Sequence, residues 1–296
     1  MSYVLTLIGN QNTPLTEKTV GAVASAIGAS TAPVWLNPGH ACDITPGTAD
    51  REKTLAEARD ALSGAAIDAV FQPTAHRRKK LLVADMDSTI IQQECIDELA
   101  DALGLRDAIS QITERAMRGE LEFEPALRER VALLKGLAEA ELLRVYENQI
   151  TETPGGRALC ATMRTNGATC ALVSGGFTFF TRRVAQTVGF TSHQANTLLL
   201  EDGKLTGEVA EPILGREAKV AALKNFTAEL KIDPAETMAV GDGANDLAMI
   251  GEAGLGVAFH AKPVVAAAAA AQIDHGDLTA LLYVQGYTKE EIVTTL

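Results

Sequence analysis

Short apolar runs alternate with stretches of helical spacing through the first 75 residues of the chain. Three segments have the pattern of strands and two have the apolar spacing of helices: Tyr3–Ile8, Pro33–Leu36 and Ala66–Phe71 for the strands, Thr16–Ile27 and Arg51–Leu62 for the helices. This β-α-β-α-β order is typical of an α+β unit of ferredoxin-like type. We therefore predict a small α+β domain over residues 1–76.

Beyond this unit the apolar runs become continuous and lose the alternation of a half-exposed strand. Four such runs are Leu81–Ala84, Thr169–Val173, Thr237–Val240 and Gly254–Phe259. Buried strands separated by helical stretches indicate a parallel sheet with helices on both faces. Residues 77–296 are therefore predicted to form an α/β domain with a Rossmann-like parallel sheet as its core.

The connection between the first two of these runs is about eighty residues long, far more than one crossover helix requires. Within it, Glu94–Gln149 is charged and mostly helical in period, so we expect a helical cap inserted at about residues 94–150. Later in the chain, Leu198–Val209 carries Asp202-Gly203 between two alternating segments, which predicts a hairpin.

The charge and composition of the chain argue against nucleic acids and membranes as partners. The chain has 26 Lys and Arg against 38 Asp and Glu, a net charge of −12, which argues against nucleic-acid binding because such binding needs cations that neutralise phosphates. The basic run His76–Lys80 is then expected to be a solvated linker. No apolar run approaches the ~18 residues that cross a membrane. The four cysteines form no CxxC pair, so we expect a cytoplasmic protein with no membrane partner.

Polar residues follow three of the four apolar runs at the points where the runs end. They are Asp85 and Asp87, then Ser174 and Gly175, then Asp242, Asn245 and Asp246. Open parallel sheets bind ligands at their carboxyl edge, so we expect these groups to meet in one crevice. A single Asp-x-Asp turn is more often a turn or a helix N-cap than a site. Two acidic turns at one edge suit Mg²⁺, which binds carboxylates together with phosphate oxygens.

Ser174-Gly175-Gly176 precedes a helix predicted at Thr178–Val188. A serine hydroxyl and free backbone N–H groups at a helix start can bind an anion, although an ordinary serine N-cap has the same pattern. Lys219 falls in a second predicted helix, Gly215–Leu230, where a lysine is usually solvated. Neither feature identifies a site by itself.

Taken in order, these residues resemble the motifs of a known enzyme superfamily. The stretches that are similar to the four motifs of the haloacid dehalogenase superfamily are Asp85-Met86-Asp87-Ser88-Thr89, Ser174-Gly175-Gly176, Lys219 and Gly241-Asp242-Gly243-Ala244-Asn245-Asp246. The resemblance extends from Leu81 to about Gly286. Glu94, Phe123, Arg130 and Val173–Phe177 most resemble the phosphoserine phosphatase family within it. The N-terminal unit is similar to ACT-like amino-acid-binding modules.

The resemblance implies a phosphatase and gives the acidic residues their roles. Asp85 would be the nucleophile that forms an aspartyl-phosphate, and Asp87 would protonate the leaving oxygen and later activate water. Mg²⁺ would be held by Asp85, the Asp87 carbonyl and Asp242, with Asp246 bracing them. The implied reaction converts O-phospho-L-serine to L-serine and phosphate, the last step of L-serine biosynthesis.

By the same resemblance, four groups would bind the phosphoryl oxygens, namely Ser174, the Gly175 amide, Lys219 and Asn245. Glu94 and Arg130 would pair with the ammonium and the carboxylate of phosphoserine. Phe123 and Met117 would line the apolar wall that closes over the site. Without the resemblance, Glu94 and Arg130 would be expected on solvated helix faces.

Other functions remain open from the sequence. The closest alternatives are a phosphatase for another small phosphorylated metabolite and a phosphotransferase that uses the same aspartyl-phosphate. An alternative from a different class is an amino-acid-sensing regulatory protein, because the N-terminal unit resembles ACT-like modules. Such modules also make a homodimer through residues 1–76 a prediction.

Overall fold

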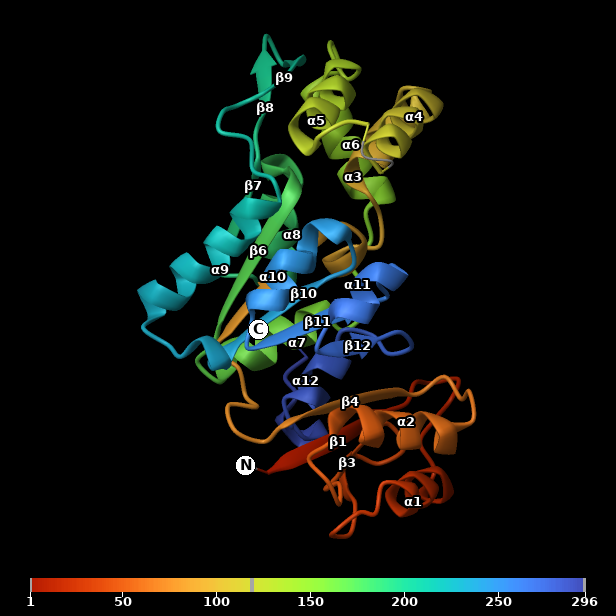
Figure 1. Ribbon diagram of the computed structural model, residues 1–296. Helices are drawn as coiled ribbons and strands as arrows, with labels where there is room; N and C mark the ends of the chain where they lie inside the picture. The colour runs from red at the N-terminus through yellow and green to blue at the C-terminus, as the bar shows by residue number, and fades with distance from the viewer. Residues whose placement is uncertain (1, 118–119, 295–296) are drawn as a thin grey trace.

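The computed structural model describes residues 2–117 and 120–294, apart from the side chains of residues 116 and 117. A large parallel sheet lies in the middle of the molecule, with a small antiparallel sheet at one end and a group of helices at the other (Figure 1). Among the described residues, no helix combines the length and the hydropathy needed to cross a membrane.

The N-terminal sheet is antiparallel, with the strand order β2-β3-β1-β4. Its elements are β1 (Tyr3–Ile8), α1 (Glu17–Ala26), β2 (Val34–Asn37), β3 (Ala41–Ile44), α2 (Arg51–Leu62) and β4 (Asp68–Pro73). Since alternate residues of a strand share one face, the paired residues Leu5–Ile44 and Leu7–Cys42 lie together in the core under the two helices. Thr16 is the N-cap of α1, and its hydroxyl accepts a hydrogen bond from the Thr19 N–H.

The predicted ferredoxin-like type is confirmed, but the structure has four strands where the sequence pattern predicts three. The order observed is β-α-β-β-α-β, which is the ferredoxin-like connectivity. The strand absent from the prediction, β3, has only four residues, and Asp43 interrupts its apolar run. The Asp43 carboxylate accepts a hydrogen bond from the Thr6 hydroxyl on β1 at 2.8 Å, so the polar residue is satisfied within the sheet.

The central sheet is parallel throughout, with the order β12-β11-β10-β5-β6-β7. Its strands are β5 (Leu81–Ala84), β6 (Thr169–Phe177), β7 (Ser192–Asn196), β10 (Thr237–Gly241), β11 (Leu255–Phe259) and β12 (Ala271–Ile273). The predicted α/β fold is therefore confirmed, and all four predicted strands are present. The two edge strands were not predictable as apolar runs, because β7 is mostly polar and β12 has three residues.

Helices cover both faces of the central sheet. They are α7 (Gly156–Thr165), α8 (Thr178–Val188), α9 (Arg216–Leu230), α10 (Leu247–Glu252), α11 (Pro263–Ala268) and α12 (Ala280–Val284), with the short turns η1 (Met86–Ile90), η2 (Pro234–Glu236), η3 (Ala244–Asp246) and η4 (Lys289–Glu291). Leu81 and Val83 pack with residues of α9 and α10. Leu82 and Ala84 point the opposite way, into the larger core with α7, α8 and α12.

The helical cap lies between β5 and β6 in the chain, as predicted. It consists of α3 (Cys95–Ala102), α4 (Arg106–Met117), α5 (Phe123–Ala132) and α6 (Glu139–Gln149). The predicted hairpin, β8 (Leu198–Glu201) and β9 (Lys204–Val209), extends from the sheet and lies beside α5 (Figure 1). Gly207 of β9 sits against Ala132 and Lys135, so the hairpin supports the cap from one side.

The junction between the two sheets differs from the solvated linker that the sequence predicts. Arg77 is only 15% exposed, and it donates two hydrogen bonds to the Asp43 carboxylate, at 2.6 and 2.8 Å. It also donates to the Val284 carbonyl at 2.8 Å and the Tyr283 carbonyl at 3.1 Å. Lys79 is buried as well, and its ammonium donates to the Ala235 carbonyl at 2.8 Å. Arg77 therefore connects the N-terminal sheet, through Asp43, to the C-terminal part of the chain, through Val284. Lys79 fixes the junction to the turn that precedes β10.

A second contact ties the N-terminal sheet to the C-terminal part of the chain. The Asp68 carboxylate at the start of β4 is buried and accepts hydrogen bonds from the backbone N–H groups of Asp274, His275 and Gly276, the shortest at 2.8 Å. A carboxylate that accepts several N–H groups is held in one orientation. The antiparallel sheet is therefore fixed against the segment that follows β12.

Arg77→Ala should destabilise the protein by about 3 kcal/mol, because it leaves the Asp43 carboxylate without its charged partner in a half-buried place. Lys80→Ala, in the same junction, removes an ion pair whose lysine is 58% exposed and should cost no more than about 1 kcal/mol. Urea denaturation of both variants checks this. Equal losses of unfolding free energy would show that Arg77 does not hold the two sheets together.

Candidate active site

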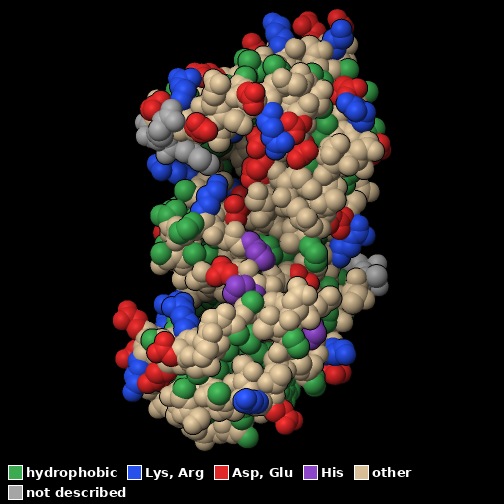
Figure 2. Space-filling view, turned by 90° about the vertical axis from the view of Figure 1, so that its right-hand side faces the viewer, with side chains coloured by type: hydrophobic (Ala, Val, Ile, Leu, Met, Phe, Trp, Pro, Cys, Tyr) green, Lys and Arg blue, Asp and Glu red, His purple; other side chains and the backbone are tan. Residues whose placement is uncertain are grey.

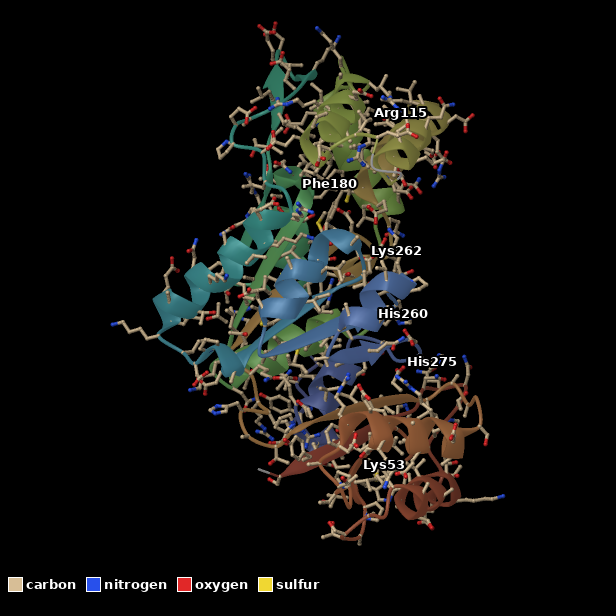
Figure 3. All side chains as sticks on the ribbon, viewed as in Figure 1. Lys53, Arg115, Phe180, His260, Lys262 and His275 are labelled. Atoms are coloured by element: carbon tan, nitrogen blue, oxygen red, sulfur yellow. The ribbon has the colours of Figure 1, made fainter. Side chains whose placement is uncertain are left out.

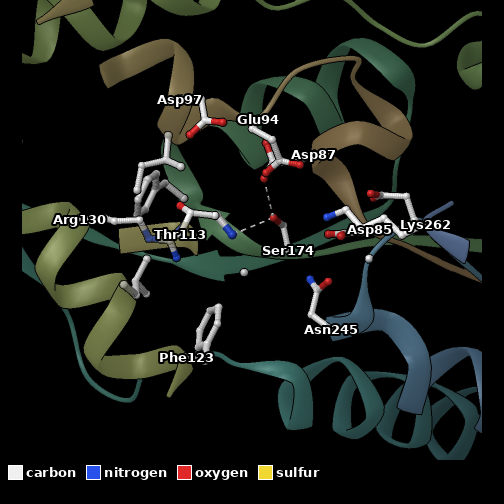
Figure 4. Close-up of a pocket in the computed structure, with 17 residues that line it drawn as sticks. Asp85, Asp87, Glu94, Asp97, Thr113, Phe123, Arg130, Ser174, Asn245 and Lys262 are labelled. Carbon is white, nitrogen blue, oxygen red and sulfur yellow. Dashed lines mark hydrogen bonds between the residues drawn. The ribbon is translucent and has the colours of Figure 1, made fainter. Parts of the chain in front are cut away.

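A cavity of about 260 Å³ opens between the carboxyl edge of the central sheet and the cap (Figure 4). The ends of three neighbouring strands meet there, because Ala84 of β5 pairs with Val240 of β10 and with Leu172 of β6. Of the residues singled out in the sequence, those that line the cavity are Asp85, Asp87, Glu94, Phe123, Arg130, Ser174, Gly175, Asp242 and Asn245. Seen from the side of α11, acidic side chains gather in this hollow (Figure 2).

Lys219 is buried behind the cavity and joins two of the acidic residues. Its ammonium lies 2.7 Å from a carboxylate oxygen of Asp85 and 2.7 Å from one of Asp246. Although burial opposes it, these two carboxylates raise the pKa of Lys219 above its usual value. The lysine is only 2% exposed, so the solvated position that is usual on a helix does not apply. The lysine is therefore protonated and forms ion pairs with Asp85 and Asp246.

Asp87 lines the same cavity as Asp85, and its two carboxylate oxygens have different neighbours. One of its oxygens accepts a hydrogen bond from the Cys95 N–H at 3.0 Å, and the other lies 3.4 Å from the Ser174 hydroxyl. Burial, with the charges of Glu94 and Asp85, raises the pKa of Asp87 to about 8. A carboxyl group with that pKa holds a proton at neutral pH and can donate it.

The helix after the glycine segment has the predicted bounds, since α8 covers Thr178–Val188, but Ser174 is not its N-cap. β6 continues through Ser174 and Gly175 to Phe177, and Phe177 is the N-cap of α8. The Ser174 hydroxyl instead accepts a hydrogen bond from the Gly176 N–H at 2.8 Å. A Cβ on Gly176 would lie 2.8 Å from an oxygen of Asp87, so glycine allows the close approach of the two motifs.

Asn196 holds this segment and was not singled out in the sequence. Its side-chain NH₂ donates to the Gly175 carbonyl at 2.8 Å and to the Leu214 carbonyl at 3.2 Å, and its oxygen accepts from the Leu214 N–H at 2.7 Å. The side chain is 2% exposed. Asn196 therefore fixes the glycine segment to the start of the helix that carries Lys219. In the sequence, the feature that could have indicated this role is the position of Asn196, a polar residue at the end of a short edge strand.

Three acidic side chains are close enough to hold one cation. Carboxylate oxygens of Asp85, Asp242 and Asp246 all lie within 4.8 Å of one another. Burial, together with the nearby charges of Asp85 and Glu94, raises the pKa of Asp242 to about 6. Hard cations such as Mg²⁺ and Ca²⁺ take oxygen ligands of this kind. The donor set therefore fits the divalent cation that the sequence predicts.

The cap supplies the wall opposite the acidic turns. Arg130 of α5 lies at one side of the cavity, where its side chain is anchored by a hydrogen bond to the Ala126 carbonyl at 3.2 Å. Glu94 accepts a hydrogen bond from the Ser88 hydroxyl at 2.7 Å. The Phe123 ring lies so close to Gly175 that a Cβ at this position would be 3.3 Å from the ring. Met117 ends α4, and its side chain is outside the described residues.

The sequence missed three other polar residues of the cavity. Asp97 and Thr113 of the cap and Lys262 after β11 line it as well. Asp97 and Thr113 lie on amphipathic helices, where polar residues usually face solvent. Lys262 follows an apolar strand, as the acidic turns do, and this position could have indicated in the sequence that Lys262 lies at the same edge of the sheet.

Comparison with known proteins agrees with this geometry. The sequence profile described as haloacid dehalogenase-like hydrolase matches residues 82–251, which include the acidic turns, the glycine segment and Lys219. The chain belongs to the haloacid dehalogenase-like hydrolase family. The match begins in β5 and ends in α10, so it includes the cap and most of the central sheet.

Curated relatives in this family are phosphoserine phosphatases. The chain is 44% identical over 225 residues to that of Streptomyces coelicolor, a match that covers 76% of this chain and 55% of the relative. It is 45% identical to that of Albidiferax ferrireducens, a match that covers 69% of this chain and 88% of the relative. The chain thus spans about half the length of the first relative and most of the second.

The whole fold also has a counterpart among solved structures. The crystal structure of a probable phosphoserine phosphatase from Vibrio cholerae superposes with a TM-score of 0.78 at 30% identity. It covers 98% of this chain and 88% of its own, so the N-terminal unit is included in the similarity.

Proposed function

We propose that this protein is a phosphatase that hydrolyses O-phospho-L-serine to L-serine and phosphate. The observation that carries the proposal is that Glu94 and Arg130 line the same cavity as Asp85 and Ser174. An anionic and a cationic side chain match the ammonium and the carboxylate of an amino acid, next to the groups that handle a phosphoryl group. The phosphoserine phosphatases among the relatives support this substrate.

The reaction proceeds in two displacements at phosphorus. The Asp85 carboxylate attacks, the bond from phosphorus to the serine oxygen breaks, and Asp87 gives its proton to that oxygen, which releases L-serine. A water molecule then attacks the aspartyl-phosphate as Asp87 takes a proton from it. Phosphate leaves, and both carboxyl groups regain their starting states. The high pKa of Asp87 suits the first step, because the acid must hold a proton while Asp85 is ionised.

The negative charge of the phosphoryl oxygens is offset by groups that are already in place. Ser174, Gly175 and Asn245 line the cavity together with Asp85, and the Ser174 hydroxyl, the Gly175 N–H and the Asn245 side chain would bind the phosphoryl oxygens, while Lys219 lies behind Asp85. In phosphoryl transfer, positioning and electrostatic stabilisation supply most of the catalysis. The hydrogen bonds of Asn196 keep the glycine segment in this position.

We propose Mg²⁺ as the cation of the acidic site, held by Asp85, Asp242 and the backbone carbonyl of Asp87, with Asp246 bracing the group. When bound, it neutralises charge on the phosphoryl oxygens and orients the ester for attack. The support for this choice is the all-oxygen donor set, because Mg²⁺ prefers carboxylates and phosphate oxygens.

Two further proposals concern the protein as a whole. We place it in the cytoplasm, supported by four cysteines that are all unpaired and buried. We also propose a homodimer through the N-terminal unit, on the resemblance to ACT-like modules alone. Sedimentation of the full chain tests the dimer.

The decisive test of the substrate is phosphate release from O-phospho-L-serine and from a panel of other phosphorylated metabolites, with Mg²⁺ and with EDTA. We expect a strong preference for phosphoserine that is lost with EDTA. Release without that preference would favour a phosphatase for another metabolite, and transfer to added alcohols would favour a phosphotransferase. Serine binding without any release would favour the sensor.

Asp85→Asn should lower kcat for phosphoserine at least about a thousandfold, because the amide cannot form the aspartyl-phosphate. The fold should persist, since Lys219 keeps its pair with Asp246. Asp60→Asn is the matched control, because it makes the same change of charge at an exposed aspartate of α2, and it should keep kcat within a few fold. Turnover by Asp85→Asn close to that of the control would rule out Asp85 as the nucleophile.

Arg130→Ala should raise KM for phosphoserine about a hundredfold and leave KM for a small aryl phosphate nearly unchanged, because only phosphoserine has a carboxylate to pair with. Arg128→Ala is the control on the same helix, where Arg128 is 49% exposed and pairs with Glu211. Steady-state kinetics on both substrates measure the split. An equal rise on both would remove Arg130 from substrate selection.

A further inference from the structure

Lys262 is a cavity residue that lies outside the four motifs. It follows β11 and is the N-cap of α11, with Pro263 at the first helical position. Its backbone N–H donates a hydrogen bond to the Asp242 carbonyl at 3.1 Å, which fixes the backbone of Lys262 to the second acidic turn. The side chain lies on the flank of the molecule between the cap and the N-terminal unit (Figure 3).

The charges that line the cavity are unbalanced. The carboxylates are those of Asp85, Asp87, Glu94, Asp97 and Asp242, and the cations are Arg130 and Lys262. A phosphate ester that enters this cavity brings further negative charge, so a cation at the entrance favours its approach. Lys219 is buried behind Asp85, and its ammonium contacts Asp85 and Asp246 at 2.7 Å each, so it does not lie at the entrance of the cavity.

The two lining cations lie at opposite sides of the cavity (Figure 4). Arg130 is on the side of Asp97, and Lys262 is on the side of Asp85. The positive charge of Lys262 acts on both Asp242 and Glu94, whose pKa values it lowers against the effect of burial. Among the described residues, no carboxylate forms an ion pair with Lys262, and its side chain is exposed. Lys262 is therefore a cation available to a ligand at the phosphoryl end.

We propose that Lys262 binds the phosphoryl group of the incoming substrate at the mouth of the cavity. The assignment rests on the proposed phosphatase function and adds a phosphoryl-binding residue to it. Lys262 contributes to capture of the phosphoryl group, whereas Arg130 contributes to recognition of the carboxylate at the other end. An ammonium on a flexible stem suits this role, because it can follow the phosphoryl group from the mouth to Asp85.

The test is Lys262→Gln in the full chain, with Mg²⁺ present. We expect KM for phosphoserine and for a small aryl phosphate to rise by the same factor, about tenfold for the loss of one partly solvated charge. kcat should stay within about threefold, and Lys262→Arg should restore KM. Lys53→Gln is the control, because it removes one positive charge from a residue that is 60% exposed in the N-terminal unit.

Binding of inorganic phosphate gives a second readout that needs no turnover. Calorimetry should show a Kd for phosphate about tenfold weaker in Lys262→Gln than in the Lys53→Gln control. A rise of KM confined to phosphoserine would overturn the proposal, since Lys262 would then act on the amino-acid end through Glu94. Unchanged KM and Kd would also overturn it. If the unaltered protein shows no preference for phosphoserine, the proposed substrate fails, while the aryl phosphate and phosphate results still test Lys262.

Discussion

The ammonium of Lys219 joins three elements that are distant in sequence. Lys219 belongs to α9, Asp85 follows β5, and Asp246 belongs to η3 after β10. Taking these charges out of water is costly unless each is paired, so the three elements are constrained to meet at one point. The acidic turns acquire their relative position from this constraint. A surface lysine at the same position in the helix would leave two carboxylates without a buried partner.

Around this centre, the remaining groups are arranged by backbone contacts. Asn196 fixes the glycine segment to the beginning of α9, so that Ser174 is held near the Asp87 carboxylate and Lys219 is held against that of Asp85. The β8–β9 hairpin supports α5 through the close packing of Gly207, and α5 carries Arg130. In the proposed mechanism, the groups for phosphorus chemistry thus come from the sheet edge, and the groups for the amino acid come from the cap.

The sequence predicted those parts of the protein whose signals are local. The four buried strands are continuous apolar runs, and the acidic and glycine turns follow them directly, so the sheet edge and its residues could be placed. Strands β3, β7 and β12 were missed, because short or polar edge strands lack a periodic signal. The burial of Lys219 depends on partners elsewhere in the chain, and only the resemblance indicated a function for it. Arg77 and Lys79 are also buried because their partners lie elsewhere in the chain, and the sequence of a charged run does not show such partners.

The hydrogen bonds that Asp68 accepts from the segment after β12 have a consequence for the order of folding. Asp68 and Asp274 are 206 residues apart, so this contact closes a very long loop. A ribosome adds about 5–20 residues per second, so the N-terminal unit emerges roughly 10–40 s before the segment that it rests on. During that interval the carboxylate of Asp68 and the face around it are exposed to water and to other proteins. The face of the N-terminal unit around Asp68 is therefore a site at which the nascent chain is exposed to aggregation until the rest of the chain has been made.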